Sequence, residues 1–418
     1  MFQMTPKSSI SSQLPKLSRA GEQLKSMVQL PGPFAELPRH PILYNHFSPI
    51  HPLPSLSTPS QRPKQAGINI YAKREDHGAP LACAGNKYRK LEYIVPDILS
   101  PTPTYHYHEH HPTTEKLNGP ATILVTEGAI QSNHTVQVAA LAHTLGLKAL
   151  VLLSRGTGGG LLASHDQDAF VSSGNVQINR MLGAEVRVLE EGDPISNDAN
   201  PVLEELRTRE ERPYWIPGGA SLHALGGLGY ARAAFEIETQ ERELNLKGSG
   251  QFDYIFVACG SGSTLGGLIA GFKLGEPAIT TRQIIGVLNS PTKPRSYHEA
   301  RVLTFARRAA ELIGFDGKNR LESEHAIITD DVRLEDRFVG TGYGILDAET
   351  KEAMEVMANS EGIILDPVYT GKVARAMMQW VREHEIQQFA RQRELDEVNV
   401  LFIHTGGQAA LGAYADVI

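Results

Sequence analysis

The sequence predicts an α/β protein in which parallel sheets are flanked by helices and grouped into two lobes. From Ile123 onward, short continuous apolar runs alternate with helical patterns, as in buried parallel strands joined by crossover helices. A second set of apolar runs begins at Tyr254 and repeats the alternation. The chain has 418 residues, which is long enough for two such units.

The first set predicts strands at 123–125, 149–153 and 186–189, with helices over 133–143 and in the segment that leads to 181–183. The second set predicts strands at 254–258, 283–288 and 399–403. Residues 100–119, which precede the predicted strand at 123–125, are rich in proline and polar side chains, which predicts a surface insertion.

One loop of the second set is suited to binding a phosphate. The predicted strand at 254–258 is followed by a glycine- and hydroxyl-rich loop and then a helix of small residues, the loop being Gly260-Ser261-Gly262-Ser263-Thr264. Backbone N–H groups in such a loop point at a phosphate, and the helix N-terminus adds positive potential. Because glycine-rich turns are common, a tight strand–helix connection packed by small residues is the alternative.

A lysine is placed to complete such a site. Lys87 directly follows a Gly-Asn turn and begins the helical pattern of residues 87–92. A placed lysine, with a phosphate loop that lacks a lysine of its own, indicates pyridoxal phosphate (PLP) rather than a nucleotide, held as a Schiff base. Burial and the neighbouring Arg89 and Lys90 would lower the pKa of Lys87. The alternative is a surface lysine at a basic helix start.

These motifs resemble, in order, those of the D-cysteine desulfhydrase and 1-aminocyclopropane-1-carboxylate (ACC) deaminase family. The matching segments are 73–76, 85–92, 132–137, 218–229, 260–264, 342–344, 365–372 and 404–407. The resemblance runs from about residue 52 to the C-terminus and implies fold type II of the PLP enzymes, which is tryptophan synthase β-like. It implies a larger PLP-binding lobe (31–89 and 220–418), a smaller lobe (90–219) and a homodimer. Residues 1–30 are expected to form a tail.

The resemblance also assigns roles to side chains. It places Asn133 against the phenolic oxygen of the cofactor, and Ser132 at the substrate carboxylate or in proton transfer. From the residues alone, either could simply cap the following helix. Tyr343 and Tyr369 match active-site tyrosines of the family, although each could otherwise be a partly buried structural tyrosine. The remaining predicted cofactor-binding residues are Lys90, Gly260, Ser261, Gly262, Ser263, Thr264 and Thr370.

Thr370 separates the two branches of the family. The family pattern directs this side chain at the pyridine nitrogen, where ACC deaminases typically carry glutamate and D-cysteine desulfhydrases a hydroxyl. Eliminating a good β leaving group such as thiolate needs less electron withdrawal than breaking a C–C bond. His134 also resembles the desulfhydrase branch. We therefore expect a PLP-dependent lyase that performs α,β-elimination on a small amino acid, D-cysteine or a related D-amino acid, giving pyruvate and ammonia, with sulfide when the substrate is cysteine.

Three alternatives stay open. The first is ACC deaminase, which would give 2-oxobutyrate and ammonia. The second is a specialised β- or γ-replacement enzyme of secondary metabolism. The third is a PLP-binding protein without activity, against which the retained Lys87, Ser132, Tyr343 and Tyr369 weigh.

Composition excludes several other classes. The formal net charge of −7 argues against nucleic acid or an anionic membrane as the main partner. No apolar run approaches the roughly 20 residues of a membrane span. The two cysteines, Cys83 and Cys259, provide no disulfide framework, and Cys259 is expected to be a small buried residue beside the phosphate loop.

Two polar segments, the N-terminal tail and the insertion at 100–119, bear on location and metal binding. The Ser-rich N-terminus with Lys7, Lys16 and Arg19 allows a mitochondrial transit peptide, but a plain extension and a cytoplasmic location are the default. A solvated insertion is favoured over a metal site for the histidines in it, since no rigid element fixes them, and no metal is predicted. These histidines are His106, His108, His110 and His111.

Overall fold

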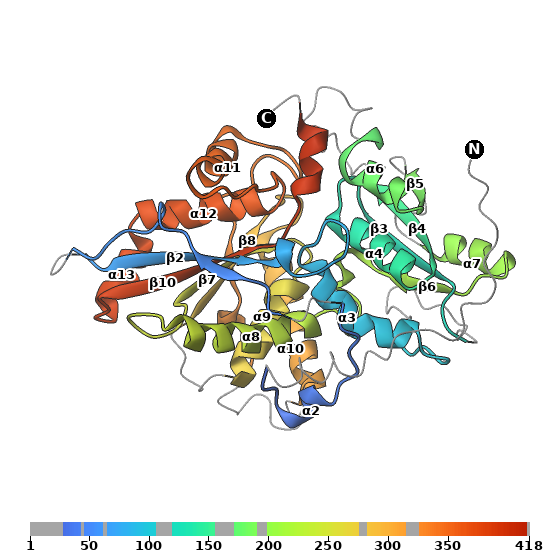
Figure 1. Ribbon diagram of the computed structural model, residues 1–418, viewed down its shortest axis with the longest axis horizontal. Coiled ribbons are helices and arrows are strands. Elements are labelled where there is room, and N and C mark those ends of the chain that lie inside the picture. Colours follow the sequence, from blue (N-terminus) through green and yellow to red (C-terminus); the bar gives the residue numbers. More distant parts are fainter. Residues whose placement is uncertain are drawn as a thin grey trace.

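The computed structural model describes residues 28–42, 46–61, 65–105, 119–154, 171–189, 199–275, 282–314 and 326–415. Within these ranges the chain forms two sheets covered by helices (Figure 1). The predicted tail up to residue 27 and the four histidines of the predicted insertion lie outside the described residues. No helix in the described part is both long and apolar enough to cross a membrane.

The smaller sheet has four parallel strands in the order β5-β4-β3-β6. The strands are β3 (Ile123–Ala129), β4 (Lys148–Ser154), β5 (Glu185–Leu189) and β6 (Pro213–Ile216), and the helices are α4 (Asn133–Thr144), α6 (Gly174–Met181) and α7 (Asn200–Thr208). Leu124 of β3 belongs to the main core, whereas Ile123 and Val125 pack in a separate cluster with residues of α7. Successive residues of a strand point to opposite faces, so both faces of this sheet are buried under helices.

The larger sheet has six strands in the order β1-β2-β10-β7-β8-β9, of which only β1 runs antiparallel to its neighbour. Its strands are β1 (Ile50–Pro52), β2 (Gly67–Arg74), β7 (Tyr254–Cys259), β8 (Gln283–Leu288), β9 (Arg333–Glu335) and β10 (Glu397–His404). The strands predicted from the second set correspond to β7, β8 and β10, while β1, β2 and β9 are additional. In the smaller sheet, β6 is additional. The predicted α/β class is confirmed.

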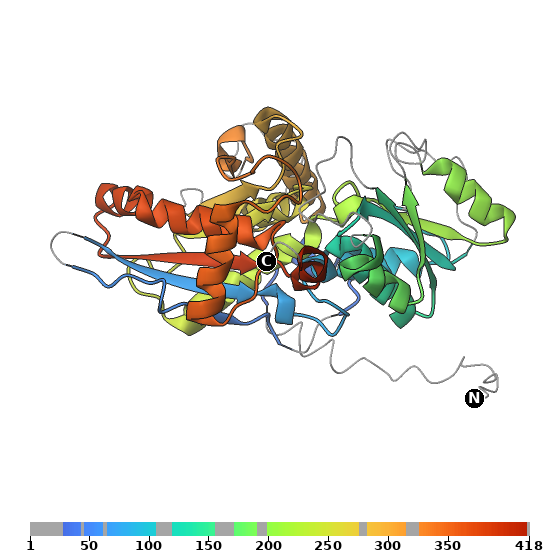
Figure 2. The same ribbon diagram turned by 90° about the horizontal axis from the view of Figure 1, so that it is seen from above.

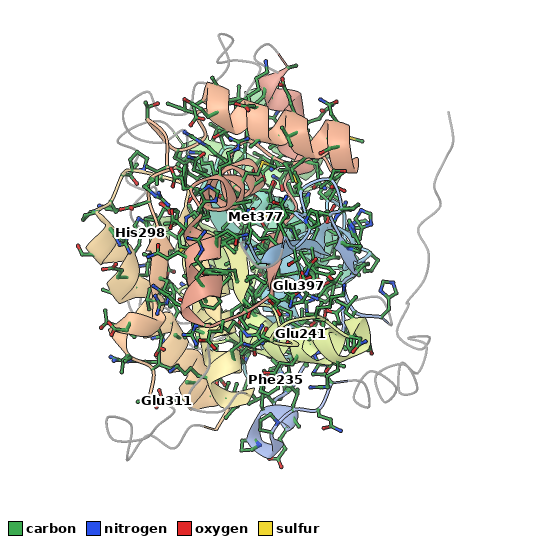
Figure 3. The ribbon with its side chains drawn as sticks, turned by 90° about the vertical axis from the view of Figure 1, so that its left-hand side faces the viewer. Phe235, Glu241, His298, Glu311, Met377 and Glu397 are labelled. Atoms are coloured by element: carbon green, nitrogen blue, oxygen red, sulfur yellow. The ribbon has the colours of Figure 1, made fainter. Side chains whose placement is uncertain are left out.

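Helices cover both faces of the larger sheet. Ile255 and Val257 of β7 pack in one core cluster with α8 (Leu228–Leu244), α9 (Ser263–Gly275) and α10 (Arg295–Leu312). Tyr254 and Phe256 pack in the other with α11 (Ala348–Glu361), α12 (Thr370–Arg382) and α13 (Glu385–Gln392). Figure 3 shows these layers end-on, with Met377 of α12 and Phe235 of α8 on opposite sides of the sheet.

One helix lies where the two sheets meet. α3 (Lys87–Ile98) contacts α8 of the larger lobe and α4 of the smaller one, and Figure 2 shows the two lobes side by side. The shorter helices are α2 (Gly32–Ala35), η1 (Glu75–His77), η3 (Gly218–Ala220), η4 (Thr329–Asp331) and η5 (Gln408–Tyr414). The predicted lobe boundaries remain a proposal. The contacts of α3 place its first residue between two α/β units.

Candidate active site

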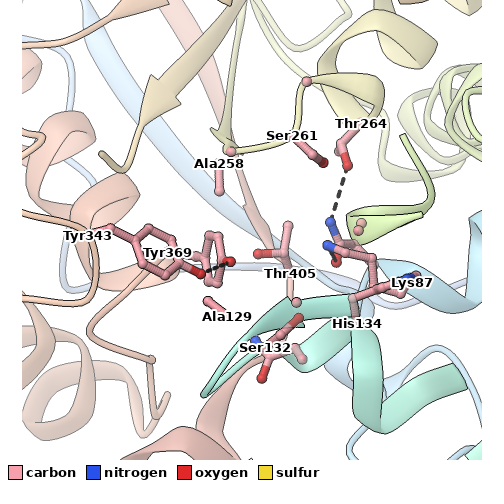
Figure 4. A pocket seen from close by; sticks show the side chains of 17 residues that line it. Lys87, Ala129, Ser132, His134, Ala258, Ser261, Thr264, Tyr343, Tyr369 and Thr405 are labelled. Atoms are coloured by element: carbon pink, nitrogen blue, oxygen red, sulfur yellow. Dashed lines mark hydrogen bonds between the residues drawn. The ribbon is translucent and has the colours of Figure 1, made fainter. Parts of the chain in front are cut away.

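A pocket lies where strand ends of both sheets approach α3. The cavity has a volume of about 180 Å³ and is lined by residues of the smaller lobe, the larger lobe and α3 (Figure 4). The predicted residues that line it are Lys87, Ser132, Asn133, Gly260, Ser261, Gly262, Thr264, Tyr343 and Tyr369. Parallel strands present their carboxyl ends at one edge of a sheet, so segments that follow β3 and β7 can meet there.

Lys87 is the first residue of α3 and faces this pocket. Its Nζ donates to Oδ1 of Asn86 over 2.8 Å, and Nδ2 of Asn86 donates to the hydroxyl of Thr264 over 3.2 Å. Desolvation lowers the pKa of Lys87 to about 8, while the carboxylate of Asp366 opposes this shift. The amine is therefore partly neutral near physiological pH, as a nucleophile requires.

Arg89 does not contribute to that shift in the way the sequence suggested. Its guanidinium turns away from the pocket and is buried between two carboxylates, donating to Glu75 over 2.7 Å and to Glu236 over 2.9 Å. These partners neutralise its charge, so burial accounts for the low pKa of Lys87 and Arg89 does not. This expectation was wrong because residues two positions apart on a helix point in directions about 200° apart.

The glycine-rich loop lies between β7 and α9, as predicted. Gly260, Ser261, Gly262 and Thr264 line the pocket, and the N-terminus of the 13-residue helix α9 faces it. Ser263 is buried behind the loop and does not line the pocket. Its hydroxyl accepts from Nζ of Lys90 over 2.8 Å, and the same Nζ donates to the carbonyl of Gly219 over 2.9 Å. Lys90 therefore holds the loop from behind.

Ser132 and Asn133 lie at the N-terminus of α4 and line the pocket. In Figure 4, Ser132 lies across the pocket from Ser261 of the glycine-rich loop. Ser132 occupies the N-cap position, but its hydroxyl caps no backbone N–H of the helix. The capping alternative is thus not realised for this side chain, and its hydroxyl is left for the pocket. Asn133 accepts a hydrogen bond from Asn175 through Oδ1 over 2.7 Å.

His134 also lines the pocket and is buried. The hydroxyl of Thr126 donates to the carbonyl of Ile216 over 2.7 Å, so it accepts from Nε2 of His134 over 3.0 Å. Burial, followed by the nearby Lys87 and Lys90, lowers the pKa of His134 well below its ordinary value. The imidazole is therefore neutral and carries its proton on Nε2.

The two predicted tyrosines meet on the far side of the pocket from Lys87 in Figure 4, where a hydrogen bond joins their hydroxyls. Burial raises the pKa of Tyr369 to about 12 and that of Tyr343 well above its ordinary value. Both phenols are protonated near neutral pH. Since one hydroxyl donates to the other, the accepting hydroxyl keeps a proton that it can donate into the pocket.

Thr370 begins α12, is fully buried, and is not among the residues that line the pocket. Its hydroxyl donates to Oδ1 of Asp366 over 2.7 Å and accepts from the backbone N–H of Asp366 over 2.8 Å. The Asp366 carboxylate also accepts from the backbone N–H of Tyr369 over 2.9 Å. The structure thus shows Thr370 as part of a turn that fixes Tyr369.

Sequence patterns gave no role to several residues at the site, among them Asp366 and Thr405. Thr405 follows β10 directly and lines the pocket, and the strand-end rule that located the other loops could have indicated it. Gly407, two residues later, has a φ of +112°, and a Cβ there would lie 2.8 Å from Nδ2 of Asn133 and 2.6 Å from Cγ of Asp366. Only glycine allows these two side chains to approach the chain so closely.

The sequence profile described as "Pyridoxal-phosphate dependent enzyme" matches residues 43–406. This chain belongs to the pyridoxal-phosphate dependent enzyme family. A 1-aminocyclopropane-1-carboxylate deaminase of Burkholderia ambifaria (strain MC40-6) is 35% identical over 382 residues, covering 91% of this chain and 97% of that protein. Another of Methylobacterium nodulans is 36% identical over 350 residues, covering 83% of this chain and 89% of that protein.

Solved structures agree with the family. A crystal structure described as an ACC deaminase homologue has a TM-score of 0.67 and 29% identity, and the match covers 92% of this chain and 96% of that one. A fungal L-serine ammonia-lyase from Rhizomucor miehei has a TM-score of 0.52 at 14% identity, covering 90% and 98% of the two chains, which supports the fold alone. The predicted PLP-dependent enzyme of fold type II, in the D-cysteine desulfhydrase and ACC deaminase family, is confirmed.

The pocket fits the cofactor of this family. It combines a lysine amine of lowered pKa with a glycine-rich loop at a helix N-terminus, which are the groups that an aldehyde and a phosphate require. PLP is therefore the cofactor, while the assignment of individual residues to its atoms remains a proposal.

Proposed function

We propose that this protein is an ACC deaminase, which converts ACC and water into 2-oxobutyrate and ammonia. The similarity to ACC deaminases over nine-tenths of the chain supports this substrate over D-cysteine, which the sequence motifs had favoured. The observation that carries the reaction type is the pocket, in which Lys87 and the Tyr343–Tyr369 pair flank one small cavity. Bound PLP supplies an electron-withdrawing ring that accepts negative charge from the substrate.

The N-terminus of α4 is the proposed site for the substrate carboxylate. Helix N-termini attract anions because their first N–H groups lack intrahelical partners. The hydroxyl of Ser132 lies beside these groups and is not used as a cap. A carboxylate bound there would direct the remainder of a small amino acid towards Lys87 and the tyrosines.

The proposed proton transfers use the two flanking groups. ACC has no hydrogen on Cα, so opening its ring requires a proton to be removed from one ring carbon and another to be delivered to a second. Lys87, whose pKa of about 8 allows a neutral amine, is the proposed base. The protonated tyrosine pair is the proposed acid, since burial keeps both hydroxyls neutral.

The test is product formation by the purified protein loaded with PLP. ACC, D-cysteine and L-cysteine are supplied separately, and 2-oxobutyrate, pyruvate and sulfide are measured. We expect 2-oxobutyrate from ACC, its loss in Lys87→Ala, and a fall of roughly 100-fold or more in Tyr369→Phe, in the range of general acid–base catalysis. Pyruvate and sulfide from D-cysteine, without any product from ACC, would overturn the proposal.

D-Cysteine desulfhydrase activity is the second candidate, because position 370 carries a hydroxyl rather than a carboxylate. The hydroxyl of Thr370 is buried and donates to Asp366, which weakens this argument. The same assay separates the two candidates. A PLP-bound protein that turns over none of the three substrates would instead favour the replacement enzyme or the inactive binder.

The expected partners are a small amino acid and a second copy of the chain. The homodimer rests on the family resemblance, and light scattering of the purified protein tests it. A mass of twice 45.7 kDa would support the dimer, and a single 45.7 kDa species would contradict it.

A further inference from the structure

Asn133 lines the pocket with an amide whose two ends have different chemistry. An amide nitrogen donates hydrogen bonds and an amide oxygen accepts them, so the side chain suits an anionic ring oxygen only when its nitrogen faces the ligand. If the amide of Asn133 were turned by 180°, its Oδ1 would face the ring oxygen of the ligand, and neither oxygen could donate a hydrogen bond. The proposed role of Asn133, at the phenolic oxygen of PLP, therefore depends on what fixes this orientation.

A buried asparagine on α6 supplies that constraint. Nδ2 of Asn175 donates to the backbone carbonyl of Gln131 over 2.8 Å, and to Oδ1 of Asn133 over 2.7 Å. A backbone carbonyl can only accept, so the end of Asn175 that faces it must be the nitrogen. Its second hydrogen then requires an acceptor, and the only acceptor on the Asn133 side chain is Oδ1. The nitrogen of Asn133 is consequently the end of this amide that Asn175 leaves unbound.

The position of Asn175 is itself fixed. Its backbone N–H donates to Oε1 of Gln131 over 2.8 Å, and its side chain is fully buried. A Cβ on the preceding Gly174 would lie 2.5 Å from the same Oε1, so the chain passes Gln131 as closely as glycine permits. On the other side, Nδ2 of Asn133 lies against Gly407.

We propose that Asn175 is a positioning residue for the cofactor, which holds Asn133 with its amide nitrogen towards the phenolic oxygen of PLP. The chain of constraints runs from the Gln131 carbonyl through Asn175 to Asn133, and joins α6 to the N-terminus of α4. This inference rests on the proposed cofactor contact of Asn133. Asn175 lies outside the pocket, so it acts only through Asn133.

Asn179 offers a matched control. It lies one turn further along α6, is fully buried, and donates through Nδ2 to the hydroxyl of Thr135 on α4 over 3.1 Å. The same Nδ2 donates to the backbone carbonyl of Asn175 over 2.9 Å, but not to its side chain. It therefore ties the same two helices together without touching a residue that lines the pocket. A variant at this position should lower stability as a variant at Asn175 does, but should leave the cofactor unaffected.

The experiment compares Asn175→Ala, Asn133→Ala, the double variant and Asn179→Ala. For each, the dissociation constant of PLP is measured by fluorescence, and the absorbance band of the bound cofactor is titrated with pH. We expect Asn175→Ala to weaken PLP binding by roughly 3- to 10-fold, the range of one hydrogen bond, and to shift the titration midpoint in the same direction as Asn133→Ala. The double variant should match Asn133→Ala alone, because both substitutions remove the same hydrogen bond to the cofactor. Asn179→Ala should leave the constant within about 2-fold.

A second variant covers the case in which Asn175→Ala folds poorly. Asn175→Asp keeps the shape of the side chain but cannot donate, so the amide of Asn133 should turn its nitrogen away from the pocket, and the band should shift further than in Asn175→Ala. A normal band in both Asn175 variants, with a shifted band in Asn133→Ala, would overturn the positioning role. A normal band in Asn133→Ala would show that Asn133 does not contact the cofactor, and would overturn the inference with the site assignment.

Discussion

Burial sets the proton state of the side chains around the pocket. It removes the charge from part of the Lys87 population by lowering the pKa to about 8, and it keeps the proton on Tyr369 by raising the pKa to about 12. The same desolvation therefore produces a base from one residue type and an acid from another, because in both cases it disfavours the charged form.

The shift of Lys87 predicts the pH dependence of cofactor capture. Only the neutral amine reacts with the PLP aldehyde, and lowering the pKa moves the neutral form to lower pH. The rate constant for PLP incorporation into the apo-protein should therefore rise with pH and level off above a midpoint near 8. Stopped-flow absorbance measures this rate, with Lys87→Ala as the blank. A midpoint near 10.4, the ordinary value for lysine, would contradict the burial of this amine.

At the scale of elements, α3 is held by a buried ionic network on the side away from the pocket. The carboxylate of Glu236 on α8 accepts from Lys73 of β2 over 2.7 Å and from Arg89 of α3 over 2.9 Å. Arg89 also pairs with Glu75 over 2.7 Å. Although burial opposes it, the two cations hold the pKa of Glu236 below its usual range. The network thus fixes the helix that begins with Lys87.

Replacing Glu236 with glutamine should be strongly destabilising. The substitution preserves volume but leaves Lys73 and Arg89 buried without their shared carboxylate, which costs about 3–5 kcal/mol of unfolding free energy. Urea unfolding near pH 7 measures this loss. The control is Glu205→Gln, which removes the half-exposed partner of Arg187 and should change the free energy by about 1 kcal/mol or less.

The pH dependence of the Glu236→Gln effect provides a further check. Folding lowers the pKa of Glu236, so its contribution is present above the unfolded value near 4.5 and is lost as pH falls through the lower folded value. The wild type and the variant should therefore converge in stability on acidification. An equal gap at neutral and strongly acid pH would assign the loss to packing rather than to charge.

At the scale of the whole molecule, the pocket depends on both lobes. Ser132 follows β3 of the smaller sheet, Ser261 follows β7 of the larger one, and Lys87 begins the helix between them. A ligand that contacts all three binds the folded arrangement and not the unfolded chain. Binding should consequently stabilise the molecule as a unit.

PLP should raise the thermal unfolding temperature of the apo-protein. At a PLP concentration about 100 times the dissociation constant, mass action predicts about 2.7 kcal/mol of stabilisation. Thermal scans followed by circular dichroism measure the shift. Lys87→Ala should show a smaller rise, because the loop contacts remain while the covalent link is lost. An unchanged unfolding temperature of the wild type would contradict a cofactor site that joins both lobes.

Local patterns predicted the parts of this site that depend on chain-adjacent residues. The loop after β7, the N-terminus of α4 and the position of Lys87 at the start of α3 follow from strand runs, turn residues and helical periodicity. The directions in which individual side chains point from those elements could not be predicted in the same way. Arg89 was expected beside Lys87 but points into the buried network, and Thr370 was expected at the cofactor but binds Asp366.

The sequence by itself determined the α/β class, the PLP chemistry and most of the residues that line the pocket. The class follows from the alternation of strand and helix patterns along the chain, and the site residues follow from motifs of a few consecutive residues. Only the tertiary structure decided that the Tyr343 and Tyr369 hydroxyls meet, that Lys90 supports the loop from behind, and that Asn175 orients Asn133. These contacts join residues far apart along the chain. They depend on how separate helices and loops pack against one another, which no local pattern encodes.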